Sequence, residues 1–187
     1  YNAAIIFYQQ LLVEIPMRYI FLLLITLTCQ PALADGGLFD DGQKWPLVTD
    51  IGWSDERYLT TQVELIDELG RQRLGTPVRG NMGDIELLQR MVYRGLIGKD
   101  DKQTLQAMGA VLGNLMVQTR GLSWKVYEDE YGRSRAVCAL DTDRCLFPVT
   151  MLSRRLKVGL VVDVQAVFDN AMELINPYLP VKPYQAR

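Results

Sequence analysis

The chain has 187 residues, of which 49% are hydrophobic and 22% charged, with a formal net charge of -2. These values are typical of a globular domain. The chain contains no histidine, which excludes Ser/His and Cys/His nucleophile pairs and removes the usual zinc and iron ligand sets. Its 20 basic and 22 acidic residues are interspersed, without the basic stripe of a nucleic-acid binder. We therefore expect no nucleic-acid partner.

Residues 17–34 have the order of segments found in a secretory signal peptide. Met17 and Arg18 precede the apolar run YIFLLLITLT, and Ala32 and Ala34 occupy the small-residue positions that a signal peptidase recognises. We expect cleavage after Ala34 and a periplasmic or secreted protein. No membrane span is expected after removal of the signal.

Two alternatives remain for this segment. A membrane anchor is disfavoured because the apolar run is about half of the roughly 20 residues that a helix needs to cross a bilayer, and Pro31 follows it. Lipidation at Cys29 is disfavoured because no small residue lies directly before the cysteine. Residues 1–16 precede the complete signal and contain no methionine, so we expect them to be absent from the mature protein.

Export changes the expected state of the cysteines. Cys29 would leave with the signal, and Cys138 and Cys145 would remain as an even pair in an oxidising compartment. The sequence ALDTDR between them is polar and turn-like, so the two cysteines can face each other across the neck of a hairpin. We predict a disulfide, with two separate buried thiols as the alternative. The spacing is not C-x-x-C, so redox catalysis is not indicated.

Residues 35–53 are rich in glycine and aspartate and have no sustained periodicity, which predicts an extended lead-in. Trp45 and Trp53 lie within it. Such tryptophans can stack on sugars, but they more often fix a lead-in strand to the surface of a domain, and we favour that interpretation.

Apolar residues then recur at helical spacing in three segments, beginning at Ser54, Asp84 and Asp100. Ser54 and Asp100 are the predicted N-terminal caps of the first and third helices. In the third helix Gly109 and Gly113 lie one turn apart, which predicts the close approach of another backbone segment.

After these helices the apolar period changes to two, which is typical of strands with one buried face. The predicted strands are residues 122–127, 133–140 and 145–147. Two further helices begin at Pro148 and near Asp163, and residues 177–187 form an irregular, proline-rich tail. This order predicts a single α+β domain over residues 54–176, with helices packed on a small antiparallel β-hairpin or three-stranded meander.

Several motifs in this region resemble those of an uncharacterised bacterial family, the domain-of-unknown-function family numbered 3806. The motifs are Gly109-x-x-x-Gly113, Trp124, Asp129-Glu130-Tyr131-Gly132, Phe147-Pro148 and Ser153-Arg154-Arg155. The resemblance covers about residues 99–172. It implies an α+β fold and an exported bacterial protein, but no chemistry. The two cysteines are not a feature of the family.

The acidic turn of the hairpin is the densest group of charges. Successive strand residues point to opposite faces, and a hairpin tip is normally solvated, so a solvated turn is favoured over a catalytic carboxylate pair. We predict that this hairpin forms a surface for a protein partner, with Glu128, Asp129, Tyr131, Arg133 and Arg135 as its residues.

Arginines at positions 133, 135, 154 and 155 are expected to collect near the hairpin and to pair with its acidic residues. Asp141 and Asp143 lack the spacing and glycine of a calcium loop. No catalytic, cofactor-binding or metal-binding residue is assigned.

These observations favour a noncatalytic, exported protein-interaction domain. The first alternative is a carboxylate-dependent hydrolase of cell-envelope glycans, with acidic residues drawn from distant positions. The second is an immunity-type inhibitor whose acidic balance suits a basic toxin.

Overall fold

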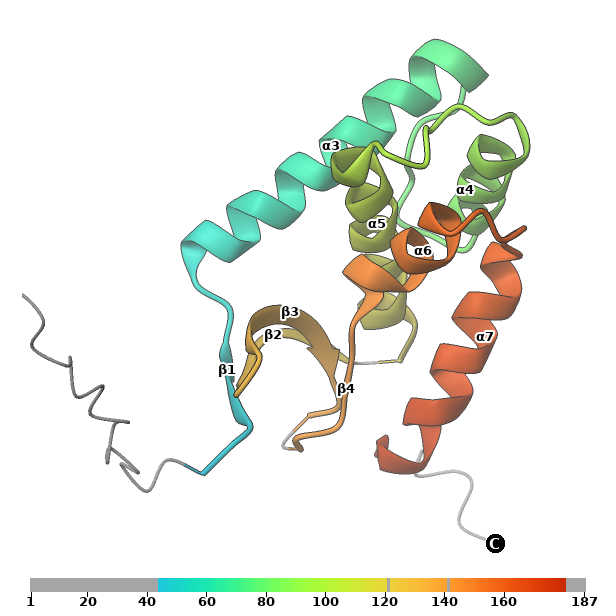
Figure 1. The fold of residues 1–187 in the computed structure, drawn as a ribbon. Coiled ribbons are helices and arrows are strands. Elements are labelled where there is room, and N and C mark those ends of the chain that lie inside the picture. Colours follow the sequence, from blue (N-terminus) through green and yellow to red (C-terminus); the bar gives the residue numbers. More distant parts are fainter. Residues whose placement is uncertain (1–43, 121, 141, 181–187) are drawn as a thin grey trace, which may run out of the picture. The chain divides into compact units, whose positions relative to one another are not determined.

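The computed structural model describes residues 44–120, 122–140 and 142–180 (Figure 1). The predicted signal peptide, the residues before it and most of the predicted tail lie outside these ranges. No helix within the described ranges is long and apolar enough to cross a membrane.

Four antiparallel strands form one sheet in the order β1-β2-β3-β4. They are β1 (Leu47–Asp50), β2 (Ser123–Asp129), β3 (Gly132–Cys138) and β4 (Cys145–Leu146). The predicted meander corresponds to β2, β3 and β4. The predicted lead-in contributes a fourth strand, β1, which pairs with β2 at the edge of the sheet.

Among the described residues, five α-helices accompany the sheet, and the predicted α+β class is confirmed. They are α3 (Trp53–Leu74), α4 (Gly83–Tyr93), α5 (Lys102–Arg120), α6 (Pro148–Lys157) and α7 (Val164–Ile175), followed by the short 3-10 helix η1 (Asn176–Tyr178). Figure 1 shows α5 between α3 and α7, and α5 packs against both α3 and α6.

Two predicted helix caps are wrong. The first helix starts at Trp53 with Gly52 at the cap position, and no side chain caps it, so Ser54 lies inside the helix. At the start of α5 the Asp101 carboxylate, not that of Asp100, accepts a hydrogen bond from the Thr104 amide at 3.0 Å. Both errors displace a helix end by one or two residues, the usual uncertainty of such boundaries.

The core lies around α5, which is buried on most of its surface. Its fully buried side chains include Met108, Leu112, Leu115 and Met116, which pack with apolar residues of α3, α4 and α7. A helix buried on nearly every side becomes the centre of the domain, and its two glycines set how closely its neighbours approach.

The predicted close approach at Gly109 is confirmed. A Cβ atom there would lie 2.3 Å from the carbonyl oxygen of Pro148, so the start of α6 rests directly on this glycine. At Gly113 a Cβ would lie 2.3 Å from the ring of Trp124, whose indole N–H donates to Asn114 at 2.8 Å. We call these contacts the glycine joint. It fixes the first turn of α6 and β2 against α5, and thereby positions the site described next.

Candidate functional site: an arginine-lined groove

A buried aspartate joins the start of α3 to β3. Asp55 is only 2% exposed, and its two carboxylate oxygens accept hydrogen bonds from the two terminal nitrogens of Arg133 at 3.1 and 2.6 Å. The Nε of Arg135 forms an ion pair with the same carboxylate at 2.9 Å. The guanidinium of Arg135 also stacks on the Tyr58 ring, 3.9 Å from its centroid. The Asp55 carboxylate is therefore paired with two arginines.

The local geometry explains this arrangement. Residues 133 and 135 lie on the same face of β3 because side chains alternate along a strand. Tyr58 follows Asp55 by about one helical turn, so both side chains lie on the same side of α3. Hydrogen bonding by Arg133 lowers the pKa of Asp55 against the opposing effect of burial, and the same bond raises the pKa of Arg133.

The expectation that these arginines pair with the acidic residues of the hairpin is wrong for their main contact. Glu128 lies opposite Arg133 in the β2–β3 register, but the carboxylate that binds Arg133 belongs to Asp55, 78 residues earlier in the chain. The sequence interpretation missed Asp55 and Tyr58. A signal was present, because Asp55 continues the buried stripe formed by Leu59 and Ile66 toward the start of the helix.

An open cavity of about 260 Å³ lies beside this charge cluster. Three arginines line it, Arg133, Arg135 and Arg154, together with the side chains of Gln106 and Thr150. Its apolar wall consists of Tyr58, Phe147 and Val149.

A second cavity of about 340 Å³ shares Gln106, Thr150 and Arg154 with the first. Three lysines, Lys99, Lys102 and Lys157, and the carboxylate of Asp100 also line it. We call the two cavities together the basic groove. It runs from β3 across α5 and α6 to the loop before α5.

Arg154 is placed differently from the next residue along the chain. It lines both cavities of the basic groove, and within the described part of the chain its guanidinium has no hydrogen-bond or ion-pair partner. Arg155 lines neither cavity, and its guanidinium donates to the carbonyl of Met151 at 2.6 Å. The lysine side chains of the second cavity likewise have no acidic partner among the described residues. The groove therefore contains four cations that form no ion pair among the described residues, and one acidic residue, Asp100.

A third cavity, of about 370 Å³, lies between α3, α5 and the α3–α4 loop. It is lined by acidic residues, and we call it the acidic cavity. Asp67 accepts hydrogen bonds from the Val78 amide at 2.7 Å and from Arg71 at 2.6 Å. The bond from Arg71 is the largest of the effects that lower the pKa of Asp67. This is the opposite of the shift that a general acid needs.

Asp84 lines the same cavity and is 1% exposed. Its two oxygens accept hydrogen bonds from the amides of Arg79 and Gly80 at 2.9 and 2.7 Å. The two aspartates of this acidic cavity therefore hold the backbone of the α3–α4 loop. No group of three or more histidine, cysteine, aspartate or glutamate side chains that would suit a metal ion occurs among the described residues.

The tip of the predicted partner surface is a solvated turn. Asp129 accepts a hydrogen bond from the amide of Tyr131 at 2.9 Å, and Gly132 has a φ of 121°. The Tyr131 side chain is 90% exposed. Of the predicted surface residues, Arg133 and Arg135 line the basic groove, whereas Tyr131 lies in the turn between β2 and β3 and lines neither of its cavities.

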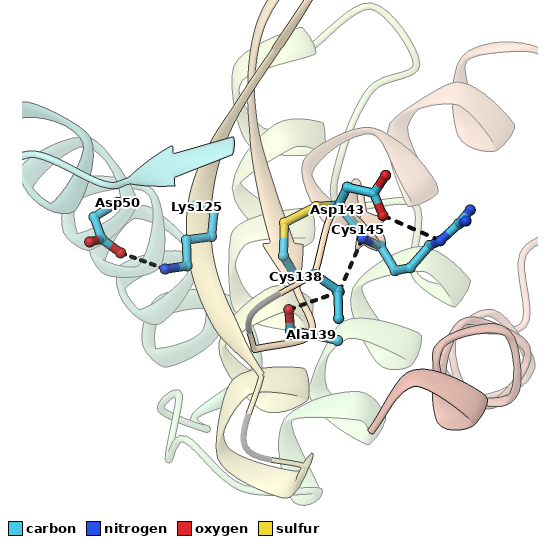
Figure 2. The surroundings of a disulfide bond; sticks show 8 residues. Asp50, Lys125, Cys138, Ala139, Asp143 and Cys145 are labelled. Atoms are coloured by element: carbon cyan, nitrogen blue, oxygen red, sulfur yellow. Dashed lines mark hydrogen bonds and ion pairs between the residues drawn. A yellow bond between two sulfur atoms is a disulfide. The ribbon is translucent and has the colours of Figure 1, made fainter. Parts of the chain in front are cut away.

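The predicted disulfide is confirmed between Cys138 of β3 and Cys145 of β4 (Figure 2). The two residues are directly opposite each other in the strand register, with Cα atoms 4.0 Å apart. The turn between them is closed by a hydrogen bond from the Ala139 amide to the Arg144 carbonyl at 3.0 Å. Figure 2 also shows Lys125 of β2 paired with Asp50 of β1, an ion pair that links the edge strand to the hairpin.

Residues 84–168 match the family described as domain of unknown function DUF3806. The predicted resemblance is thereby confirmed, and the matched segment starts earlier than expected, at residue 84. The motif residues Gly109, Gly113, Trp124 and Pro148 meet at the glycine joint, so these four residues have a packing role. Three other motif residues line the basic groove: Phe147 in the first cavity, Ser153 in the second, and Arg154 in both.

No curated protein matches the chain. A crystal structure of a protein from Bacteroides thetaiotaomicron is similar, with a TM-score of 0.64 and 18% sequence identity. The match covers 71% of this chain and 50% of the crystallised one, so this chain spans about half the length of that protein. At this level of identity the similarity establishes the fold alone.

Proposed function

We propose that the protein is an exported, noncatalytic interaction domain that binds a protein partner through the basic groove. The observation that carries the proposal is the presence of Arg154 and three lysines, without acidic partners in the described structure, along an open groove of a chain whose net charge is -2. Charged groups arranged in this way steer association and select partners of opposite charge.

Export is supported by two independent features. The signal-like segment ends at Ala34, and the disulfide between Cys138 and Cys145 is of the kind that persists in oxidising compartments. We expect exported protein to begin near Asp35, and N-terminal sequencing of protein recovered from the periplasm or medium measures this directly. Unprocessed protein confined to the cytosol would contradict export.

A noncatalytic role is supported by the chemistry of the residues present. The chain has no histidine, and the oxygens of Asp67 and Asp84 in the acidic cavity are bound by the protein's own donors. The immunity-type alternative relied on the acidic balance of the chain, which suits a basic toxin. The basic character of the groove favours an acidic partner instead.

The test of the binding role uses adjacent arginines. Arg154→Glu reverses a charge in the groove, and Arg155→Glu makes the same change on the same helix outside both cavities. We expect a specific partner, captured by the native protein from the exported fraction, to be retained by the Arg155→Glu variant and lost by the Arg154→Glu variant. Identical capture by both variants would contradict binding through the groove.

Tyr131 tests the contribution of the hairpin tip. Its side chain is exposed at the tip of the hairpin that carries Arg133 and Arg135, so Tyr131→Ala is expected to weaken partner capture without changing the melting temperature. Unchanged capture would remove the hairpin tip from the proposed surface and leave the groove as the contact.

A further inference from the structure

The arginine hydrogen-bond donors of the basic groove that have no acceptor within the described structure indicate the chemistry of its ligand. Both terminal nitrogens of Arg133 are bound to Asp55. The Nε of Arg135 is paired with the same carboxylate, and one face of its guanidinium stacks on the Tyr58 ring. The two terminal nitrogens of Arg135 have no acceptor among the described residues. The whole guanidinium of Arg154 is available. Two planar guanidinium forks therefore line one cavity, and such forks bind carboxylates in a bidentate manner.

The shape of the groove favours an elongated ligand with more than one anionic group. The cavities of about 260 and 340 Å³ share Arg154 as a common wall, and each has cations of its own. Each also has an apolar wall, which includes Tyr58 and Phe147 in the first cavity and Leu105 in the second. A charged group on a short aliphatic stem, such as a glutamate side chain, matches this mixture of cationic and apolar surface.

The strand next to the groove favours a polypeptide over other polyanions. β4 pairs with β3 only at Val137 and Cys138. The outer edge of residues 132–136 therefore has no strand partner in the described structure, and Arg133, Ser134 and Arg135 of this stretch line the first cavity. An unpaired strand edge offers backbone N–H and C=O groups that an extended peptide can complement.

We propose that the basic groove binds an extended acidic segment of a polypeptide, whose carboxylates contact Arg135 and Arg154 while its backbone lies along the open edge of β3. This proposal rests on the function proposed above and specifies the chemistry of the partner.

Calorimetric titration with a blocked hexaglutamate peptide tests the proposal, with blocked hexaglutamine as the neutral control. We expect the native protein to bind the first peptide and not the second. Arg154→Glu should weaken binding by about tenfold or more, the loss typical of a charge-assisted hydrogen bond, and Arg155→Glu should leave affinity within about twofold. Equal affinity for both peptides, or equal losses in both variants, would overturn the proposal.

Two further ligands separate a peptide site from a generic polyanion site. A hexaglutamate with N-methylated alternate amides keeps every carboxylate but cannot pair fully with a strand edge, so we expect it to bind more weakly. A linear polyphosphate of similar charge should also bind more weakly, because it has no amide groups. Binding of either ligand as tightly as hexaglutamate would overturn the acidic-peptide assignment.

These experiments distinguish this proposal from the function on which it rests. Partner capture that depends on Arg154, combined with no binding of hexaglutamate, would overturn the acidic-peptide assignment and leave the interaction role intact. Hexaglutamate binding that depends on Arg154, combined with identical capture by the Arg154→Glu and Arg155→Glu variants, would support the acidic-peptide specificity and contradict the proposed protein partner.

Discussion

The acidic cavity and the basic groove are both open and are both lined by charged residues, but they differ in whether the protein itself supplies partners for those charges. In the acidic cavity, Asp67 and Asp84 accept hydrogen bonds from the α3–α4 loop and from a neighbouring arginine of α3. In the basic groove, Arg154 and three lysines have no acidic partner within the described structure.

This difference separates two kinds of charged group. Structural charges have partners in the same chain and stabilise the fold, whereas available charges have no such partner and can bind another molecule. A buried polar group whose partners belong to the same chain stabilises the fold, and its loss leaves those partners unsatisfied. A solvated cation without a partner contributes little to folding and remains free to bind another molecule. Asp55 lies between these cases, because it is buried like Asp84 and yet orients two arginines toward the groove.

The largest expected effect concerns the acidic cavity. Asp84→Ala removes the acceptor of two loop amides at a site that is 1% exposed, and we expect a loss of about 3 kcal/mol in the free energy of unfolding. Urea denaturation measures this loss. Glu64→Ala changes an exposed carboxylate of the same cavity and should cost at most about 0.5 kcal/mol. Similar losses in the two variants would contradict the distinction between structural and available charge.

Asp55→Asn is expected to have the next largest effect. It removes the negative charge that binds Arg133 and Arg135, and we expect a loss of about 2 kcal/mol in the free energy of unfolding. The matched control is Asp50→Asn, which breaks the Lys125 ion pair at a side chain that is 88% exposed and should cost at most about 0.5 kcal/mol. An equal loss of unfolding free energy in both variants would show that the burial of Asp55 does not strengthen its ion pairs.

The helices and the hairpin could be predicted from sequence because their signals are local. Apolar spacing located the helices, alternation located β2 and β3, and the glycine spacing in α5 predicted the close approach at Gly109. The lead-in was predicted to be extended, but its pairing with β2 was not, because four residues show no clear alternation and Lys125 lies 75 residues from Asp50 in the chain.

In the candidate site, too, contacts between residues close in sequence could be predicted, and contacts between distant residues could not. Cys138 and Cys145 lie seven positions apart in the chain, so their pairing could be predicted from the turn between them. Arg133 pairs across 78 residues with Asp55, and no local pattern connects the two. The groove itself depends on where α6 lies against α5, which the glycine joint sets through packing rather than through charge.

The pH dependence of stability sharpens the interpretation of Asp55. Its folded-state pKa is lowered below the ordinary 3.8, chiefly by the hydrogen bond from Arg133. The stabilisation is therefore fully present above that value and is lost as the pH falls through the lowered pKa. We expect the stability difference between the native protein and Asp55→Asn to be constant from pH 7 to pH 5 and to shrink below about pH 4. A difference that persisted unchanged at pH 2.5 would contradict a charge-based role for Asp55.

The smallest expected effect is the stability change caused by Arg154→Glu. Both this variant and Arg155→Glu replace a cation in the last turn of α6, so each loses a favourable interaction with the C-terminal end of the helix dipole, worth at most about 1 kcal/mol. Arg155→Glu also loses its hydrogen bond to the Met151 carbonyl. Arg154→Glu instead relieves repulsion from Lys102, Lys157 and Arg135 around the groove.

We therefore expect Arg154→Glu to be the more stable of the two variants at low ionic strength, and the gap between them to narrow as salt screens the repulsion. Thermal unfolding at low and high salt measures this gap. If Arg154→Glu were instead as destabilising as Asp84→Ala, Arg154 would belong to the structural charges, and the groove would lose the cation that distinguishes it from the acidic cavity.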